Sequence, residues 1–353
     1  MRLGVTIDYA EDFADAAAEV RRLEGAGAEV FAVSEAYSFD AVSRLGYLAA
    51  ITRTATLMSS ILPIYSRTPA LLAMTAAGLD SLSGGRFELG LGSSGPQVIE
   101  GFHGVPFARP LGHLRETVDI CRTVWRRERL EHRGREYTVP LPREQGGTGL
   151  GKPLKLINRP VRASIPVAIA ALTPRAVEQT AEIADGWFPF LYHPERADEA
   201  WGASLAAGAA RRDPALGPLD VIVGVPLFVG RDDGSDDALI ERMLSAYRER
   251  MALYVGGMGA RGANFYTDLA VRYGYGADAL RVQELYLAGE KAAASDALPD
   301  DFVLATSLIG RAGRVRERLQ AFAASGVTTV LAQPLAPTAG GRVASFEALR
   351  GML

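Results

Sequence analysis

The sequence predicts an α/β fold, a (β/α)8 TIM barrel with inserted segments, and two patterns carry this prediction. Eight short apolar runs have the length of buried strands, and segments with apolar residues at helical spacing separate them. Such alternation of strands and helices indicates a parallel sheet that is covered on both faces. The chain has 353 residues, a size that one α/β barrel can reach. An open doubly wound sheet is the alternative, and it would require fewer parallel strands than a closed barrel.

The amino-terminal half supplies four strand and helix units. The strands are expected at residues 3–8, 29–34, 56–62 and 86–91, and the helices at residues 12–26, 39–52, 69–82 and 111–127. The strand runs are rich in aliphatic residues, whereas the first helix has an alanine-rich interior. Pro69 opens the third helix, at a position where its missing N–H costs no hydrogen bond. Gly84 and Gly85 form a turn before the fourth strand.

The carboxy-terminal half continues this pattern with two interruptions. Its strands are expected at residues 165–170, 187–191, 220–229 and 328–332, and its short helices at residues 175–184, 196–210 and 313–324. Glycine and proline accumulate between residues 128 and 160, and connections of this length are usually functional. A long helical region, 236–293, contains a glycine-rich break at residues 255–259. We therefore expect a single barrel domain over residues 1–353 with insertions at about 128–160 and 236–293.

Composition excludes several classes of partner and site. The 38 basic and 41 acidic residues are mixed along the chain, so no basic stripe is available for nucleic acid. The only cysteine, Cys121, excludes an intrachain disulfide and a cysteine-cluster metal site. The four histidines lack the spacing of a metal motif, so no metal is expected. No apolar run reaches the length of a membrane span and no leader segment is recognisable, so we expect a cytoplasmic protein without a membrane partner.

The barrel topology selects the candidate site, because barrel enzymes place their chemistry at the carboxyl ends of the strands. Glu35 follows the second strand, where a carboxylate can bind a cofactor or act as a base; a solvated rim carboxylate is the equal alternative. Residues 92–97 form a glycine- and serine-rich loop after the fourth strand, which can approach a planar ligand or an anion or can be an ordinary turn. His103 is the histidine nearest to this mouth, and a structural histidine is its alternative role.

A second candidate element follows the fifth strand. Thr173 is placed to cap a helix, Pro174 is placed at its first position, and Arg175 adds a positive charge. The amino terminus of a helix binds phosphate through N–H groups that have no partner within the helix, although an ordinary capped helix gives the same pattern. Motifs of the common hydrolases, NTPases and dinucleotide-binding folds are missing from the sequence. The residues alone therefore indicate a barrel enzyme that binds a phosphate-bearing ligand.

Several motifs, in the same order along most of the chain, resemble those of the luciferase-like monooxygenase superfamily, and most of all its deazaflavin-dependent branch. They include Ser-Gly-Gly-Arg-Phe-Glu-Leu-Gly-Leu-Gly at residues 83–92 and Tyr-Val-Gly-Gly-Met-Gly at residues 254–259. The remaining similar segments are residues 34–41, 61–69, 94–98, 102–104, 149–154, 170–175, 184–187 and 264–266.

This resemblance implies an oxidoreductase that uses coenzyme F-420, a 5-deazaflavin, to transfer a hydride to or from a small organic substrate. It also implies a cis peptide between Ser60 and Ile61 beside the cofactor ring. The candidate catalytic residues are Glu35, Gln97 and His103. The expected cofactor-binding residues are Ser60, Ile61, Ser94 and Gly95 around the ring, and Ala171, Leu172, Thr173, Pro174 and Arg175 around the phosphate. The candidate substrate contacts are Tyr37, Tyr65, Lys152 and His193.

Two positions depart from the family pattern. Ala36 follows Glu35 where the branch that oxidises a sugar phosphate carries histidine, which argues against that substrate. Ser60 stands where many similar sequences carry glycine. Two other functions stay open: a monooxygenase that takes reduced FMN from a separate reductase, and a non-catalytic flavin-binding protein. The resemblance also implies a homodimer, the usual oligomeric state of the family.

Overall fold

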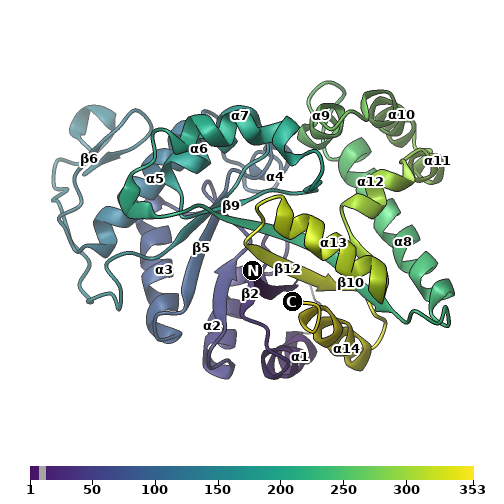
Figure 1. Ribbon diagram of the computed structural model, residues 1–353. Helices are drawn as coiled ribbons and strands as arrows, with labels where there is room; N and C mark the ends of the chain where they lie inside the picture. The colour runs from purple at the N-terminus through teal and green to yellow at the C-terminus, as the bar shows by residue number, and fades with distance from the viewer. Residues whose placement is uncertain (8–12) are drawn as a thin grey trace.

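The computed structural model describes residues 1–7 and 13–353, and its central element is a closed barrel of eight parallel strands (Figure 1). In barrel order the strands are β1 (Arg2–Ile7), β2 (Val30–Val33), β3 (Thr56–Ser59), β5 (Phe87–Gly92), β8 (Val167–Ala170), β9 (Gly186–Phe188), β10 (Asp220–Gly230) and β12 (Thr329–Pro334). Parallel pairing of β12 with β1 and of β9 with β10 closes the ring. The predicted TIM barrel is therefore confirmed, and the open sheet is excluded.

Helices of the predicted type surround the barrel. They are α1 (Phe13–Gly25), α2 (Ala41–Ile51), α3 (Pro69–Leu82), α5 (Pro110–Trp125), α6 (Pro174–Ile183), α7 (Ala197–Ala209) and α13 (Ala312–Ala324). Residue 8 of the first predicted strand and residue 12 of the first predicted helix lie outside the described residues. Of the helices in the described ranges, none has both the length and the apolar character needed to cross a bilayer.

The sequence prediction missed or simplified several elements. The third predicted strand is two pieces, since β3 ends before a bend and β4 (Leu62–Pro63) pairs separately with β5. A short helix, α4 (Pro96–Ile99), interrupts the glycine-rich loop. Strand β11 (Leu308–Arg311) pairs with the carboxyl half of β10, and helix α14 (Ala339–Arg350) follows the last barrel strand.

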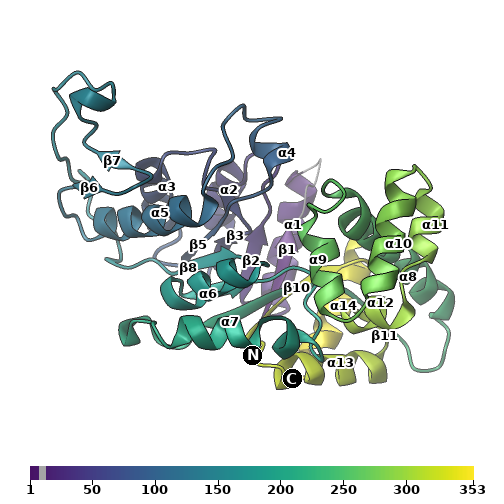
Figure 2. The ribbon, with the colours of Figure 1, turned by 90° about the horizontal axis from the view of Figure 1, so that it is seen from above.

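The two insertions lie on opposite sides of the barrel in both views (Figures 1 and 2). Residues 128–160 contain an antiparallel pair, β6 (His132–Arg133) and β7 (Thr138–Val139), and a short 3-10 turn, and this segment projects outward. The second insertion comprises α8 (Asp237–Ala252), a π-helical turn η3 (Leu253–Gly257), α9 (Phe265–Arg272), α10 (Gly276–Leu287) and α11 (Lys291–Asp296). Helical structure continues in α12 (Asp300–Ala305), beyond the predicted end at residue 293.

Side chains fill the barrel interior, so a ligand can enter only from the ends of the strands. At the amino-terminal end, Arg2 pairs with Asp220, donates to Thr329 Oγ1 at 3.0 Å and lies 3.8 Å from the carboxylate of Glu88. Burial raises the pKa of Glu88 to about 7, against the opposing charge of Arg2. Above this polar layer lies an apolar layer formed by Val30, Ala32, Met58, Ala168, Ile222 and Leu331. The carboxyl ends of the strands therefore form the open mouth.

Candidate active site

Strand register places Gly92, Ala170 and Phe188 at one level of the mouth. Leu91 pairs with Ile169, so Gly92 and Ala170 follow as neighbours, and Ala170 pairs with Phe188. Ile61 covers Gly92, because a Cβ atom at Gly92 would lie 2.8 Å from Ile61 Cδ1 and 3.5 Å from Ala170 Cβ. Glycine at this position lets the Ile61 side chain lie flat across the end of β5.

The peptide bond between Ser60 and Ile61 is cis, which confirms the expectation from the family resemblance. Ser59, one residue earlier, fixes this segment to β5: its hydroxyl donates to Gly90 O and accepts from Gly90 N, each at 2.9 Å. A Cβ atom at Gly90 would lie 1.7 Å from Ser59 O, so only glycine permits this approach. The Ser60 hydroxyl lies 3.5 Å from that of Ser34. The end of β2 and the bend after β3 therefore meet in the mouth.

Glu35 is held by three hydrogen bonds from two residues. Arg67 donates to both carboxylate oxygens, at 2.6 and 3.0 Å, and the N–H of Ala41 donates to Oε2 at 2.8 Å. The Glu35 side chain is only 7% exposed. Arg67 comes from the loop before α3, and sequence reasoning did not select it. The pair ties the loop after β2 to the loop after β4 and fixes the carboxylate at the rim.

The loop after β5 carries three of the predicted residues. Ser94 adopts a left-handed conformation with φ of 58°, and Gly95 precedes the first turn of α4. Gln97 lies on the exposed side of this turn. The His103 ring packs edge-on against Phe102 at 5.3 Å, and within the described residues its buried Nε2 has no hydrogen-bond partner. His103 therefore carries an enclosed ring nitrogen whose hydrogen-bonding capacity is unused within the described residues.

The loop after β8 begins α6 as predicted, with Thr173 at the cap position and Pro174 in the first turn. The Thr173 side chain makes no capping hydrogen bond, which differs from the predicted cap. The amides of Arg175 and Ala176 belong to the first turn, where no carbonyl within the helix can accept them. An anion can satisfy these amides and interact favourably with the helix dipole.

Residues that the sequence did not identify hold this loop from behind. Trp187 Nε1 donates to Ala171 O, and Trp201 Nε1 donates to Leu172 O, both at 2.9 Å. Arg272 also donates to Leu172 O, at 2.8 Å, and its guanidinium lies over the Trp201 ring at 5.8 Å. Burial lowers the pKa of Arg272 from its ordinary value. Two carbonyl groups of the loop are thus bound on the protein side, which fixes the loop's backbone.

The predicted substrate contacts are not gathered at one place. Tyr37 is 65% exposed and its ring lies 6.2 Å from Phe102, so it stands beside the His103 loop. Tyr65 donates to Ala108 O at 2.6 Å, and burial raises its pKa to about 12. Lys152 lies on the exposed part of the projecting insertion.

His193, the fourth predicted substrate contact, is buried in a network of side chains. Its Nε2 lies 3.2 Å from the Tyr275 hydroxyl, which donates to Asp301 at 2.8 Å, and its Nδ1 lies 3.2 Å from Glu195. Burial lowers the pKa of His193. This enclosure gives His193 a structural environment and does not favour direct contact with a substrate.

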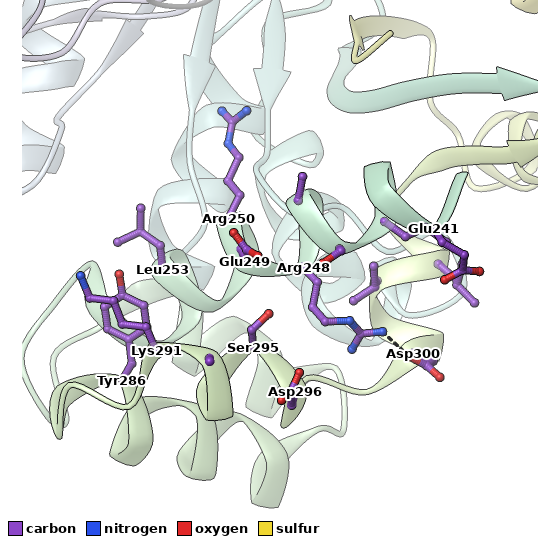
Figure 3. A pocket seen from close by; sticks show the side chains of 16 residues that line it. Glu241, Arg248, Glu249, Arg250, Leu253, Tyr286, Lys291, Ser295, Asp296 and Asp300 are labelled. Carbon is purple, nitrogen blue, oxygen red and sulfur yellow. Dashed lines mark hydrogen bonds and ion pairs between the residues drawn. The ribbon is translucent and has the colours of Figure 1, made fainter. Parts of the chain in front are cut away.

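A surface groove of about 890 Å³ lies between α8 and the helices α11 and α12, away from the mouth (Figure 3). Arg250, on α8, is one of the residues that line this groove, and its guanidinium donates to Gln333 Oε1 on β12 at 2.8 Å. The groove thus lies on the outer side of the second insertion. In the described part of the chain, no group of three or more acidic, histidine or cysteine side chains is arranged to hold a metal ion.

Comparison with known proteins agrees with this architecture. A family model described as luciferase-like monooxygenase matches residues 1–329. A putative coenzyme F-420-dependent oxidoreductase of Mycobacterium tuberculosis is 37% identical over 337 residues, which is 94% of each chain. The 5,10-methylenetetrahydromethanopterin reductase of Archaeoglobus fulgidus is 26% identical over 302 residues, covering 84% of this chain and 82% of the relative.

Solved structures show the same fold at lower identity. The coenzyme F-420-dependent tetrahydromethanopterin reductase of Methanopyrus kandleri superposes with a TM-score of 0.77 at 20% identity, covering 99% of this chain and 96% of the other. The match with the family model covers nearly the whole barrel, and the first relative matches almost end to end. The chain belongs to the luciferase-like monooxygenase family.

Proposed function

We propose that this protein is a coenzyme F-420-dependent oxidoreductase that transfers a hydride between the deazaflavin and a small organic substrate. The observation that carries the proposal is the 37% identity, over 94% of both chains, to a relative named for this activity. Two further relatives with lower identity are named as a methanopterin reductase and an F-420-dependent glucose-6-phosphate dehydrogenase. A type II Baeyer-Villiger monooxygenase in complex with FMN is among the similar solved structures, at 16% identity.

The residues of the mouth fit such a cofactor. Ile61 offers an apolar face above Gly92. Ser60 in the bend after β3, and Ser94 and Gly95 in the loop after β5, carry small groups that would let a planar ring approach closely. The turn formed by Ala171, Leu172, Thr173, Pro174 and Arg175 presents helix amides to a phosphate. When bound, the deazaflavin supplies a hydride at ring carbon 5. The protein supplies orientation and electrostatics.

The polar residues at the mouth have separate roles in this proposal. Glu35 is held by Arg67 and therefore presents a fixed negative charge at the rim. His103 holds or releases a proton at Nε2, the nitrogen without a partner in the described residues. Gln97 is a proposed catalytic residue beside the cofactor ring, and Tyr37 and Lys152 are proposed substrate contacts; all three side chains are exposed.

We further propose a homodimer in the cytoplasm. Helices α2 and α3 leave Tyr47, Leu71 and Met74 between 46% and 53% exposed, and a second copy that covered them would remove apolar surface from water. Cys121 is a free, buried thiol, which is compatible with a reducing compartment.

Equilibrium titration with coenzyme F-420, followed by cofactor fluorescence, tests the proposed site. Arg175→Ala should weaken binding by about tenfold, because it removes a charge beside the phosphate. Arg126→Ala is the matched control, since Arg126 lies on the surface and pairs with Glu128. Equal affinity of the wild-type protein and Arg175→Ala would contradict the placement of the phosphate.

A further inference from the structure

Three aromatic rings stand together beyond the carboxyl end of β9. Phe190 lies two residues after Phe188, whose ring packs against the apolar layer of the barrel interior. The ring centroid of Phe190 lies 4.5 Å from that of Tyr254 and 5.5 Å from that of Tyr266, and the two tyrosine rings lie 5.0 Å apart. All three side chains are half-buried. We call Phe190, Tyr254 and Tyr266 the aromatic wall.

The register of the barrel places this wall beside the mouth. Phe188 pairs with Ala170, so Phe190 stands one step higher, at the level of the loop that begins α6. The expected ring contacts, Ser60 and Ile61, come from the segment between β3 and β4, on the other side of β5 and β8. The wall therefore stands on the far side of β5 and β8 from the expected ring contacts.

The second insertion holds the two tyrosines in a fixed arrangement. Asn264, which is 1% exposed, donates from Nδ2 to Tyr254 O at 3.0 Å and accepts at Oδ1 from Tyr266 N at 2.9 Å. One side-chain amide thus fixes the backbone at both tyrosines. The π-helical turn packs tightly, since a Cβ atom at Gly256 or Gly257 would lie within 2.5 Å of the Tyr286 side chain. Tyr286 is one of the residues that line the surface groove (Figure 3).

A rigid group of aromatic faces favours flat or apolar partners. Ring faces gain contact area and stacking with unsaturated groups, at a low cost in side-chain entropy, and they offer no charge to a phosphorylated sugar. The rings lie at distances typical of edge-to-face and tilted pairs, so the wall is ordered before any ligand binds.

We propose that the aromatic wall binds the substrate, and that the substrate is a carbonyl or alkene compound whose reacting bond is attached to an aromatic or other apolar group. Asn264 is the positioning residue of this wall. The inference rests on the proposed function, because it places the substrate on the side of the mouth opposite to the proposed deazaflavin contacts. It extends that function by excluding polar sugar phosphates as the preferred substrate class.

The test measures binding of a defined probe to the protein saturated with coenzyme F-420. The probe is 4-phenylbut-3-en-2-one, followed by saturation-transfer NMR, with glucose 6-phosphate as the polar comparison. The variants Phe190→Leu and Tyr254→Leu keep apolar volume but remove the ring face. Phe265→Leu is the matched control, because Phe265 is adjacent to Tyr266 on α9 and is 44% exposed.

We expect wild-type protein to bind the phenyl ketone and not glucose 6-phosphate, and each wall variant to raise the Kd for the ketone by about fivefold or more. Tyr254→Phe and Phe265→Leu should bind within about twofold of wild type. Asn264→Ala should weaken binding of the ketone more than binding of F-420. A loss of folding would weaken both.

Three results would overturn the wall's role. They are equal ketone binding by wild type and the wall variants, preferential binding of glucose 6-phosphate, and a loss of F-420 affinity that parallels the loss of ketone affinity. The same titrations without F-420 separate the two proposals. Failure of wild-type protein to bind F-420 contradicts the proposed function, whereas unchanged ketone binding by the wall variants contradicts only this inference.

Discussion

Arg67 and Glu35 form a two-point ion pair at the rim of the barrel mouth, with N–O distances of 2.6 and 3.0 Å. The Arg67 and Glu35 side chains are 15% and 7% exposed, so water screens the pair weakly. Two loops that are separated in the sequence are thereby joined at the candidate site. Removal of either partner leaves a poorly solvated charge, which is more costly than replacing both.

We predict that Arg67→Met lowers the free energy of unfolding by about 3 kcal/mol, because the Glu35 carboxylate loses its counterion in a buried position. The double variant Arg67→Met with Glu35→Gln should recover more than half of this loss. Urea denaturation monitored by circular dichroism measures wild type, the two single variants Arg67→Met and Glu35→Gln, and the double variant. A loss in the double variant that equals the sum of the two single losses would show that the pair has no coupling.

Glu88 should make the stability of the barrel depend on pH. Its folded pKa of about 7 lies above the value of 4.5 expected when unfolded, so the folded state holds the proton more tightly. The contribution of this proton to the free energy of unfolding is fully present below pH 4.5 and is lost as pH rises through 7. It amounts to at most about 3 kcal/mol. Glu88→Gln cannot lose a proton and should flatten the pH dependence.

Melting temperatures of wild type and Glu88→Gln between pH 4.5 and 8 test whether stability falls as the pH rises. The variant should be the more stable protein at the alkaline end. Glu317→Gln, on the exposed face of α13, is the control and should follow wild type. Parallel curves for wild type and Glu88→Gln would contradict the assignment.

Arg272 should affect cofactor binding without touching the cofactor. It donates to Leu172 O and Ala200 O, at 2.8 and 3.1 Å, and so supports the loop that begins α6. We expect Arg272→Met to weaken F-420 binding by about tenfold, because the loop amides lose their fixed orientation. Arg281→Met, on α10, is the control. Calorimetric titration distinguishes a weaker site from a smaller fraction of folded protein, because the second lowers only the stoichiometry.

Met74→Arg should convert the proposed dimer to a monomer. Met74 is 53% exposed on α3, beside Leu71, and a charge there would be buried without a partner in a symmetric interface. Light scattering after size exclusion measures the mass of each variant. Leu280→Arg places the same charge on an exposed position of α10 and should leave the mass unchanged. A monomeric wild-type protein would contradict the dimer.

Local sequence signals predicted the elements that have clear ends. Helix α3 covers the predicted residues 69–82, because Thr68 caps it and Pro69 fits its first turn. Strand β11 was missed because it pairs with the carboxyl end of β10 outside the eight-strand barrel, where the alternating pattern predicts no strand. Helix α14 had a signal that was not used: Thr338 caps it, and the buried Phe346 and Leu349 lie three residues apart.

The sequence predicted those residues of the candidate site whose position follows from the order of the strands alone. Glu35, Ser60 and the loop after β8 follow from their places at the ends of strands. Arg67, Trp201 and Arg272 were missed because each acts on a residue between 29 and 100 positions away, and such contacts depend on how helices pack around the barrel. His193 was placed correctly after a strand, but its contact with Tyr275, 82 positions away on the second insertion, could not be read from its neighbours in sequence.

The proposed function depends on which cofactor the protein binds, and a paired titration measures this preference. Purified protein is titrated with coenzyme F-420 and with FMN, each oxidised and reduced, under the same conditions. We predict that F-420 binds at least about tenfold more tightly than FMN in both redox states. Tighter binding of FMN would contradict hydride transfer by a deazaflavin and would assign the protein to the oxygen-activating members of its family.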